Sequence, residues 1–114
     1  MKFTVTEGHF TREQALAEIA SRGWHAMELE QKEEEHLHWH DFDAVAYVLE
    51  GTARAQYADG SVQESGAGAR VEAPAGIVHR NVGPAYRVML GFSVHPSKMT
   101  RPIDKPVSQL PQPS

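Results

Sequence analysis

The sequence predicts an all-β fold, a small closed barrel or jelly roll, and three observations lead to it. Many short segments of strand character follow one another between turn signals at even spacing. Asp59 and Gly60 separate two of these segments and give the strongest hairpin signal, because a type I′ turn needs positive φ at both of its central positions. A helical pattern occurs near the N-terminus and then gives way to strands.

The expected helix covers about Arg12 to Arg22. Thr11 and Gln14 have the spacing of a capping box, and Gly23 is a typical stop signal. Apolar residues follow the box at helical intervals, namely Ala15, Leu16, Ile19 and Ala20. We therefore expect one short helix before the barrel.

The strands are expected in the middle of the chain. Their predicted ranges are Trp24–Gln31, His36–His40, Ala44–Glu50, Thr52–Ala58, Ser61–Glu64, Ala69–Ala73, Val78–Val82 and Tyr86–Val94. Beyond them lie five prolines, Pro96, Pro102, Pro106, Pro111 and Pro113, and because proline cannot donate to a sheet ladder this tail should be extended or disordered. The predicted organisation is an N-terminal segment (1–23), a barrel (24–95) and a tail (96–114).

Composition excludes several function classes. The chain has 114 residues, enough for one domain with its own core, and it has no cysteine, so any metal site must use nitrogen and oxygen ligands. A formal net charge of −4 argues against a nucleic-acid partner, which usually requires a concentrated basic face. The sequence shows neither a signal-peptide pattern nor an apolar run of membrane-spanning length, so we expect a soluble cytoplasmic protein.

The candidate site is built from histidines. His36, His38 and His40 alternate along one predicted strand, so their imidazoles should point to the same face. Neutral imidazoles bind iron, zinc, nickel and manganese, and His79 beyond the turn at Gly76 can complete the set. The alternative is that His38, His40 and His79 only pack or form hydrogen bonds.

The spacing of these residues resembles the two motifs of the cupin superfamily, in its small single-domain form. His38, His40 and Gly51 are in register with the first motif. The second motif matches at Gly68, Pro74, Gly76 and His79. The resemblance implies a cupin barrel that holds a divalent metal through His38, His40 and His79, and small cupins are commonly homodimers.

The chain departs from the family pattern at three positions. Ala44 stands where the family has its ligand glutamate, Lys32 replaces the first glycine, and Gly83 replaces an asparagine. A site of three neutral imidazoles should favour an anionic ligand in the open positions, and such sites occur in cupin-like thiol and diketone dioxygenases.

Another side chain can still supply a fourth metal ligand, or it can form a hydrogen bond to one of the three histidines. The candidates are His36 first, then Asp43, then Glu28 or Glu30. His36 can equally lie at the rim. Glu33, Glu34 and Glu35 can form a solvated turn, or one of the acidic residues before the histidines can fold back onto the metal.

Two further pairs of residues concern the cavity. Ala44 and Ala46 share the parity of His38 and His40, so they should leave a wide space beside the metal. Arg54 and Gln56 have the same parity if no bulge intervenes, and Arg54 could then bind a substrate carboxylate; the alternative is an arginine on the outer wall.

These observations lead to three hypotheses. The first is a metal-dependent enzyme acting on a small organic anion, with iron(II) and dioxygen as the chemistry to consider first. The second is a zinc, nickel or manganese enzyme for isomerase or lyase chemistry. The third is a non-catalytic cupin that binds or senses a small ligand.

Overall fold

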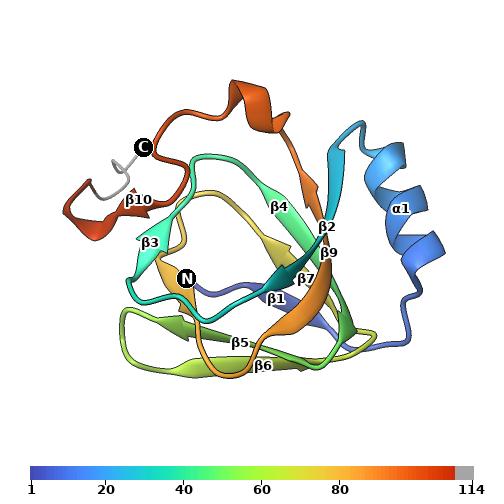
Figure 1. The fold of residues 1–114 in the computed structure, drawn as a ribbon, viewed down its shortest axis with the longest axis horizontal. Helices are drawn as coiled ribbons and strands as arrows, with labels where there is room; N and C mark the ends of the chain where they lie inside the picture. The colour runs from blue at the N-terminus through green and yellow to red at the C-terminus, as the bar shows by residue number, and fades with distance from the viewer. Residues whose placement is uncertain (110–114) are drawn as a thin grey trace.

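The computed structural model describes residues 1–109 and consists of two five-stranded antiparallel sheets that face each other (Figure 1). The first sheet contains, in order, β1 (Thr4–Thr6), β7 (Arg70–Ala73), β4 (Ala44–Glu50), β9 (Tyr86–Phe92) and β2 (His25–Gln31). The second contains β10 (Lys105–Pro106), β3 (His38–Trp39), β8 (His79–Asn81), β5 (Thr52–Tyr57) and β6 (Val62–Gly66). Two short 3-10 helices, η1 (Pro96–Lys98) and η2 (Val107–Gln109), lie near the C-terminus. The mostly β fold predicted from the sequence is therefore confirmed.

Helix α1 (Arg12–Ser21) covers the outer face of the first sheet (Figure 1). It begins with the expected capping box, in which the Thr11 side chain accepts from the Gln14 backbone N–H at 3.1 Å and the Gln14 side chain accepts from the Thr11 N–H at 2.9 Å. The buried residues under the helix form the main core, which contains Ala15, Ile19, Val45, Tyr47 and Met89. The core thus lies between helix and sheet and leaves the inside of the barrel free.

Alternation along β4 separates this core from the barrel interior. Val45 and Tyr47 are buried toward the helix, whereas Ala44, Ala46 and Val48 line a cavity between the two sheets. The small side chains at 44 and 46 therefore face inward, as the parity of the sequence predicted.

The hairpin between β5 and β6 forms at the expected place but with a different turn. The Gly60 N–H donates to the Tyr57 carbonyl at 2.9 Å, and Gly60 has φ +87°. Asp59 keeps a negative φ, so the turn is not type I′; its carboxylate instead accepts from the backbone and side chain of Ser61. A turn followed by one left-handed glycine is the other common way to close a short hairpin, and it spares Asp59 an unfavourable conformation.

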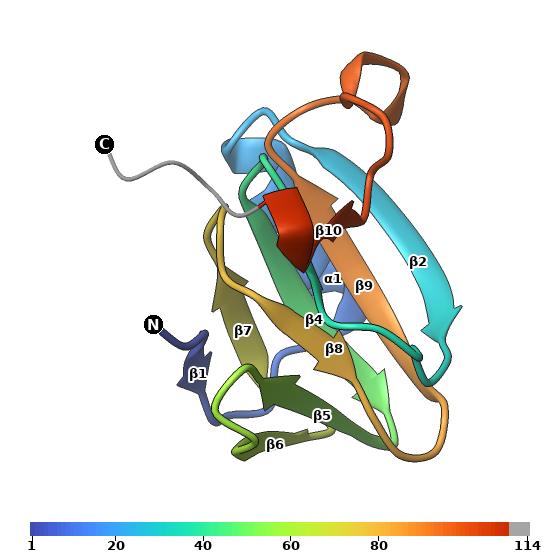
Figure 2. The same cartoon turned by 90° about the vertical axis from the view of Figure 1, so that its left-hand side faces the viewer.

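The C-terminal segment differs from the extended or disordered tail that its prolines suggested. Residues 96–109 belong to the fold, and in β10 Lys105 and Pro106 pair with Trp39 and His38 of β3 (Figure 2). The strand lies at the edge of its sheet, where proline's missing N–H is tolerated. The part of the expected tail at 110–114 lies outside the described residues.

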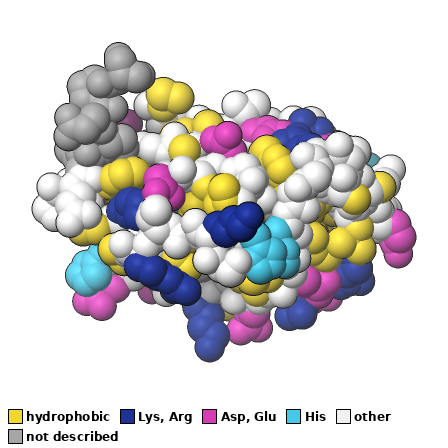
Figure 3. All heavy atoms as spheres, turned by 90° about the horizontal axis from the view of Figure 1, so that it is seen from above, with side chains coloured by type: hydrophobic (Ala, Val, Ile, Leu, Met, Phe, Trp, Pro, Cys, Tyr) yellow, Lys and Arg dark blue, Asp and Glu magenta, His cyan; other side chains and the backbone are white. Residues whose placement is uncertain are grey.

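The face seen from above in Figure 3 carries acidic and basic side chains next to one another, with hydrophobic side chains scattered among them. Among the helices of the described part of the chain, none has the length and apolar character needed to cross a bilayer.

Candidate metal centre

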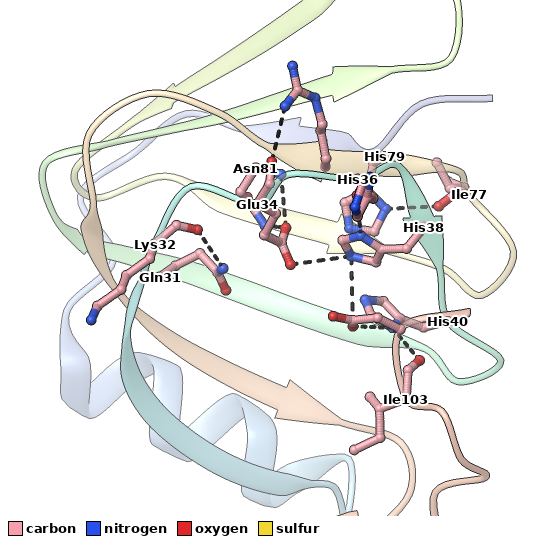
Figure 4. A network of polar contacts seen from close by, with 12 residues as sticks. Gln31, Lys32, Glu34, His36, His38, His40, Ile77, His79, Asn81 and Ile103 are labelled. Atoms are coloured by element: carbon pink, nitrogen blue, oxygen red, sulfur yellow. Dashed lines mark hydrogen bonds and ion pairs between the residues drawn. The ribbon is translucent and has the colours of Figure 1, made fainter. Parts of the chain in front are cut away.

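Three histidines meet on the inner side of the second sheet. His38 of β3 and His79 of β8 are direct cross-strand partners, and His40 follows two residues after His38. Their ring centroids lie 4.7 Å (His38–His79), 5.0 Å (His38–His40) and 5.5 Å (His40–His79) apart. Each ring offers a nitrogen within 4.8 Å of the others, and Figure 4 shows the three side chains gathered at one point. The spacing of the two sequence motifs therefore does bring these residues together.

The backbone holds each imidazole in a defined orientation. Nδ1 of His38 faces the His36 carbonyl at 3.0 Å, Nδ1 of His40 faces the Ile103 carbonyl at 3.0 Å, and Nδ1 of His79 faces the Ile77 carbonyl at 2.9 Å. A carbonyl oxygen can only accept a hydrogen bond, so each Nδ1 carries the proton. The Nε2 lone pairs are then free to bind a metal, which is the arrangement found around metal-ligating histidines.

Burial keeps two of these histidines, His40 and His79, uncharged. His38 and His79 are buried, at 5% and 7% exposure, and His40 is half-buried. Burial lowers the pKa of His79 to about 4, and burial is also the main reason that the pKa of His40 lies below its ordinary value. Both rings are therefore neutral near pH 7, the form that binds metals.

Glu34 supplies the carboxylate that the motif lacks at Ala44. One of its oxygens, Oε2, lies 3.5 Å from Nε2 of His38 (Figure 4). The other, Oε1, accepts hydrogen bonds from the backbone N–H and the side-chain amide of Asn81 at 2.9 and 2.6 Å. Of the two interpretations of the acidic residues before the histidines, folding back toward the site is the one that the structure favours for Glu34. Glu33 instead accepts from the Gly83 N–H, and Glu35 is exposed.

Asp104 is a second carboxylate at the site, and sequence reasoning missed it. Its Oδ1 lies 3.8 Å from Nε2 of His38 and 3.5 Å from Nδ1 of His40, although the side chain is largely exposed. It lies in the segment that was expected to be a free tail, so no local pattern pointed to it. The backbone at Ile103 and the strand pairing of β10 hold it there.

The donor set fits a divalent metal ion. Three imidazoles, two of them buried and one half-buried, present Nε2. Carbonyls accept their Nδ1 protons, and the Glu34 carboxylate lies beside them. Nitrogen and oxygen donors of this kind suit iron, zinc, nickel and manganese alike.

The first two candidates for a fourth ligand, His36 and Asp43, lie elsewhere. His36 was expected to point with His38, but β3 begins only at His38, and the His36 side chain is 85% exposed. It contributes its carbonyl oxygen to the orientation of His38 instead. Asp43 accepts a hydrogen bond from the Ala75 N–H at 2.9 Å, so it fixes the loop before His79 from outside the site.

The two glutamates of β2 also lie away from the histidines: one is bonded to arginines and the other is exposed. Arg12 and Arg87 each donate to Glu28 at 2.7 Å, and the hydrogen bond from Arg12 is the main reason that the pKa of Glu28 falls to about 2. Glu30 is exposed. Neither belongs to a group of residues that could hold a metal among residues 1–109.

Arg54 and Gln56 face away from the cavity, which corrects the expectation that they bind substrate. The pairing of β4 with β9 is irregular between Val48 and Glu50, and the chain then passes to the second sheet at Gly51, with φ +83°. Beyond this irregularity and turn, Ala53 and Ala55 face inward instead. Arg54 lies 3.7 Å from Glu64 on the outer wall. Gln56 accepts from Arg80 at 2.7 Å, and Arg80 also donates to the Glu34 carbonyl, so Gln56 supports the loop that carries Glu34.

The three histidines border a cavity of about 430 Å³ between the sheets. Besides the histidines, its walls are mostly apolar; the larger apolar residues among them are Phe3, Met27, Phe42, Leu90, Phe92 and Met99. A concave, largely apolar space with a few convergent polar groups is the usual form of a small-molecule site.

Comparison with known proteins agrees with this architecture. The cupin domain family matches residues 25–89. Protein NMB1881 from Neisseria meningitidis has a similar structure, with a TM-score of 0.53 and 20% identity, over 61% of this chain and 74% of that one. A DUF861 family protein from Thermotoga maritima gives the same TM-score with 21% identity, over 82% of this chain and 100% of that one.

At these identities the solved structures show the fold alone. No curated protein matches the chain in sequence. The family match covers more than half of the chain and includes all three histidines, so the chain belongs to the cupin family.

Proposed function

We propose that this cupin is a metal-dependent enzyme that acts on a small organic anion, with iron(II) and dioxygen as the chemistry to test first. The observation that carries the proposal is the convergence of three backbone-oriented imidazoles at the end of an apolar cavity. A bound divalent ion would supply Lewis acidity and, if it is iron, the capacity to react with dioxygen.

The protein's own groups would set the charge and the surroundings of the reaction. Three neutral imidazoles and the Glu34 carboxylate leave a divalent ion with one net positive charge, which one anionic group of a substrate neutralises. Asn81 holds Glu34 in place, and the Tyr86 hydroxyl donates to Asn81 at 2.9 Å from inside the cavity wall. The apolar walls exclude water from the remainder of the substrate.

Glu34 also supports a second candidate, isomerase or lyase chemistry with zinc, nickel or manganese. Its carboxylate lies beside the site and can accept a proton from a substrate that a Lewis acid has polarised. Glu34 is not needed as a base in the oxygenase proposal, so the two candidates differ in what this residue does.

The test begins with elemental analysis of protein purified without an affinity tag or chelator, beside a His79→Ala variant. Near-stoichiometric iron that is lost in the variant, together with oxygen uptake on addition of thiols or diketones, supports the oxygenase proposal. Zinc, nickel or manganese without oxygen uptake supports the second candidate. Ligand binding without turnover indicates a non-catalytic cupin. No bound metal after anaerobic addition of iron(II), and none after addition of zinc, nickel or manganese, refutes both enzyme proposals.

A further inference from the structure

The cavity beside the metal centre is hollow because of the residues placed on its walls. Five alanines face it from three strands, namely Ala44, Ala46, Ala53, Ala55 and Ala73. Small barrels normally fill their interior with side chains, since close packing stabilises them. An unfilled space of about 430 Å³ at this position forgoes that stabilisation, which indicates a binding space for a ligand.

The charges around this cavity are all at one end. Among residues 1–109, neither lysine nor arginine lines the cavity, and the only acidic residues that line it are Glu34 and Asp104 beside the histidines. Arg54, the cation expected inside, lies on the outer wall next to Glu64. Away from the histidines, an anionic group on a ligand would therefore meet no compensating cation.

The polar groups that β6, the far edge strand of the histidine sheet, presents to the cavity are uncharged. Gln63 donates to the Phe3 carbonyl at 3.1 Å and accepts from the Tyr57 hydroxyl. Ser65 is the neighbouring hydroxyl on β6 and also faces the cavity. These groups can accommodate a neutral polar atom, but they offer no positive charge to balance a carboxylate or phosphate.

We infer that the cavity takes a small molecule with one metal-binding head group and an uncharged, mainly apolar body. This inference rests on the proposed function, because the head group is placed on the metal held by His38, His40 and His79. It goes further by excluding dianionic metabolites, such as dicarboxylates and phosphate esters, from the substrates of this site. Burial of a second charge without a partner opposes their binding.

The test keeps the head group constant and changes only the body. Protein reconstituted with Co²⁺ is titrated with benzohydroxamic acid, with 4-carboxybenzohydroxamic acid, and with the methyl ester of the latter as an uncharged control of similar size. Changes in the visible Co²⁺ spectrum report binding without any need for turnover. We expect benzohydroxamic acid and the methyl ester to bind at least 30-fold more tightly than 4-carboxybenzohydroxamic acid.

Two substitutions locate the binding in the cavity. Ala46→Leu adds bulk to the cavity wall on β4 and should weaken benzohydroxamate at least tenfold while one Co²⁺ remains bound per chain. Ala58→Leu, at an exposed position beyond β5, is the matched control. It should change neither the affinity for benzohydroxamate nor the amount of bound Co²⁺. Ala55→Leu on the opposite sheet repeats the first test if Ala46→Leu does not fold.

The outcomes distinguish failure of the proposed metal site from failure of the inference about the ligand. Failure of the wild-type protein to bind Co²⁺ refutes the metal site and the inference with it. Bound Co²⁺ with equal affinity for all three hydroxamates, or tighter binding of the carboxylate, overturns the inference alone. Bound Co²⁺ with no hydroxamate binding, or full affinity in both cavity variants, overturns it as well.

Discussion

The stability of the metal-free protein should fall as the pH drops from 7 to 5, and His79 should be a principal cause. Burial lowers the pKa of folded His79 from 6.5 to about 4. In the unfolded chain His79 returns to its ordinary pKa, so between pH 6.5 and pH 4 the unfolded state binds more protons than the folded state. The free energy of unfolding then rises with pH across this window and is lost as the pH falls.

The size of the effect follows from the two pKa values. A difference of that size corresponds to roughly 3 kcal/mol over the whole window, of which about 2 kcal/mol falls between pH 7 and pH 5. His40, whose pKa is also lowered by burial, changes stability in the same direction. Glu28 has its pKa lowered to about 2, so its contribution is lost mainly below pH 5 and does not interfere.

The assay is urea unfolding of chelator-treated protein at pH 7, 6 and 5, for the wild type and for His79→Gln. The variant should retain a smaller slope of unfolding free energy against pH, because one of the buried imidazoles is gone. Wild-type stability that does not change from pH 7 to pH 5, or an unchanged slope in the variant, would show that His79 does not titrate as its burial implies.

Three further predictions concern the carboxylate, the C-terminal segment and the helix interface. Glu34→Gln should weaken Zn²⁺ binding about 10- to 100-fold in competition with a chromophoric chelator, and adding Ala44→Glu should recover part of the loss. Lys105→Ala removes a buried ammonium that donates to the Thr100 and Pro102 carbonyls, so it should cost about 1–3 kcal/mol and accelerate hydrogen exchange in residues 96–109; unchanged exchange would contradict this. Gly91→Ala should destabilise by about 1–3 kcal/mol in urea, because its Cβ would lie 2.7 Å from a helix side chain, whereas Gly66→Ala, with open space around it, should not.

Local patterns predicted most of the strands because each carries its own signal. The range expected for β4 is the one observed, Ala44–Glu50, since an apolar run between turn residues marks a buried strand. β1 and β10 were missed because strands of three and two residues are too short to show alternation. Their existence depends on partners distant in the sequence, such as Arg70–Glu72 for β1.

The site could be predicted as far as local spacing determines it. His38 and His40 share one stretch of chain, and the turn at Gly76 leads to His79, so their convergence follows once the two strands are paired. The direction of Arg54 could not be predicted, because the alternation is interrupted by an irregularity between Val48 and Glu50 and by the change of sheets at Gly51. Asp104 could not be predicted either, since the pairing of β10 with β3 brings it to the site.

The carboxylate beside the histidines comes from a different part of the chain than in the family motif. A glutamate at position 44 would approach the histidines from β4, after His40 in the sequence. Glu34 instead approaches the His38 ring from the loop before His38. That loop is fixed on β8, because the Glu34 N–H donates to the Asn81 carbonyl at 2.8 Å and the Asn81 amide holds the carboxylate.

Either position of the carboxylate places a negative charge beside the same imidazoles, so either would give a bound metal the same net charge. The two positions of the carboxylate differ in the space that remains in the cavity. With glutamate absent from position 44, β4 presents alanine to the cavity, and the space gained there is part of the room into which we place the apolar body of the ligand. A carboxylate on the loop would therefore keep the charge of the proposed metal centre while position 44 leaves more binding space next to it.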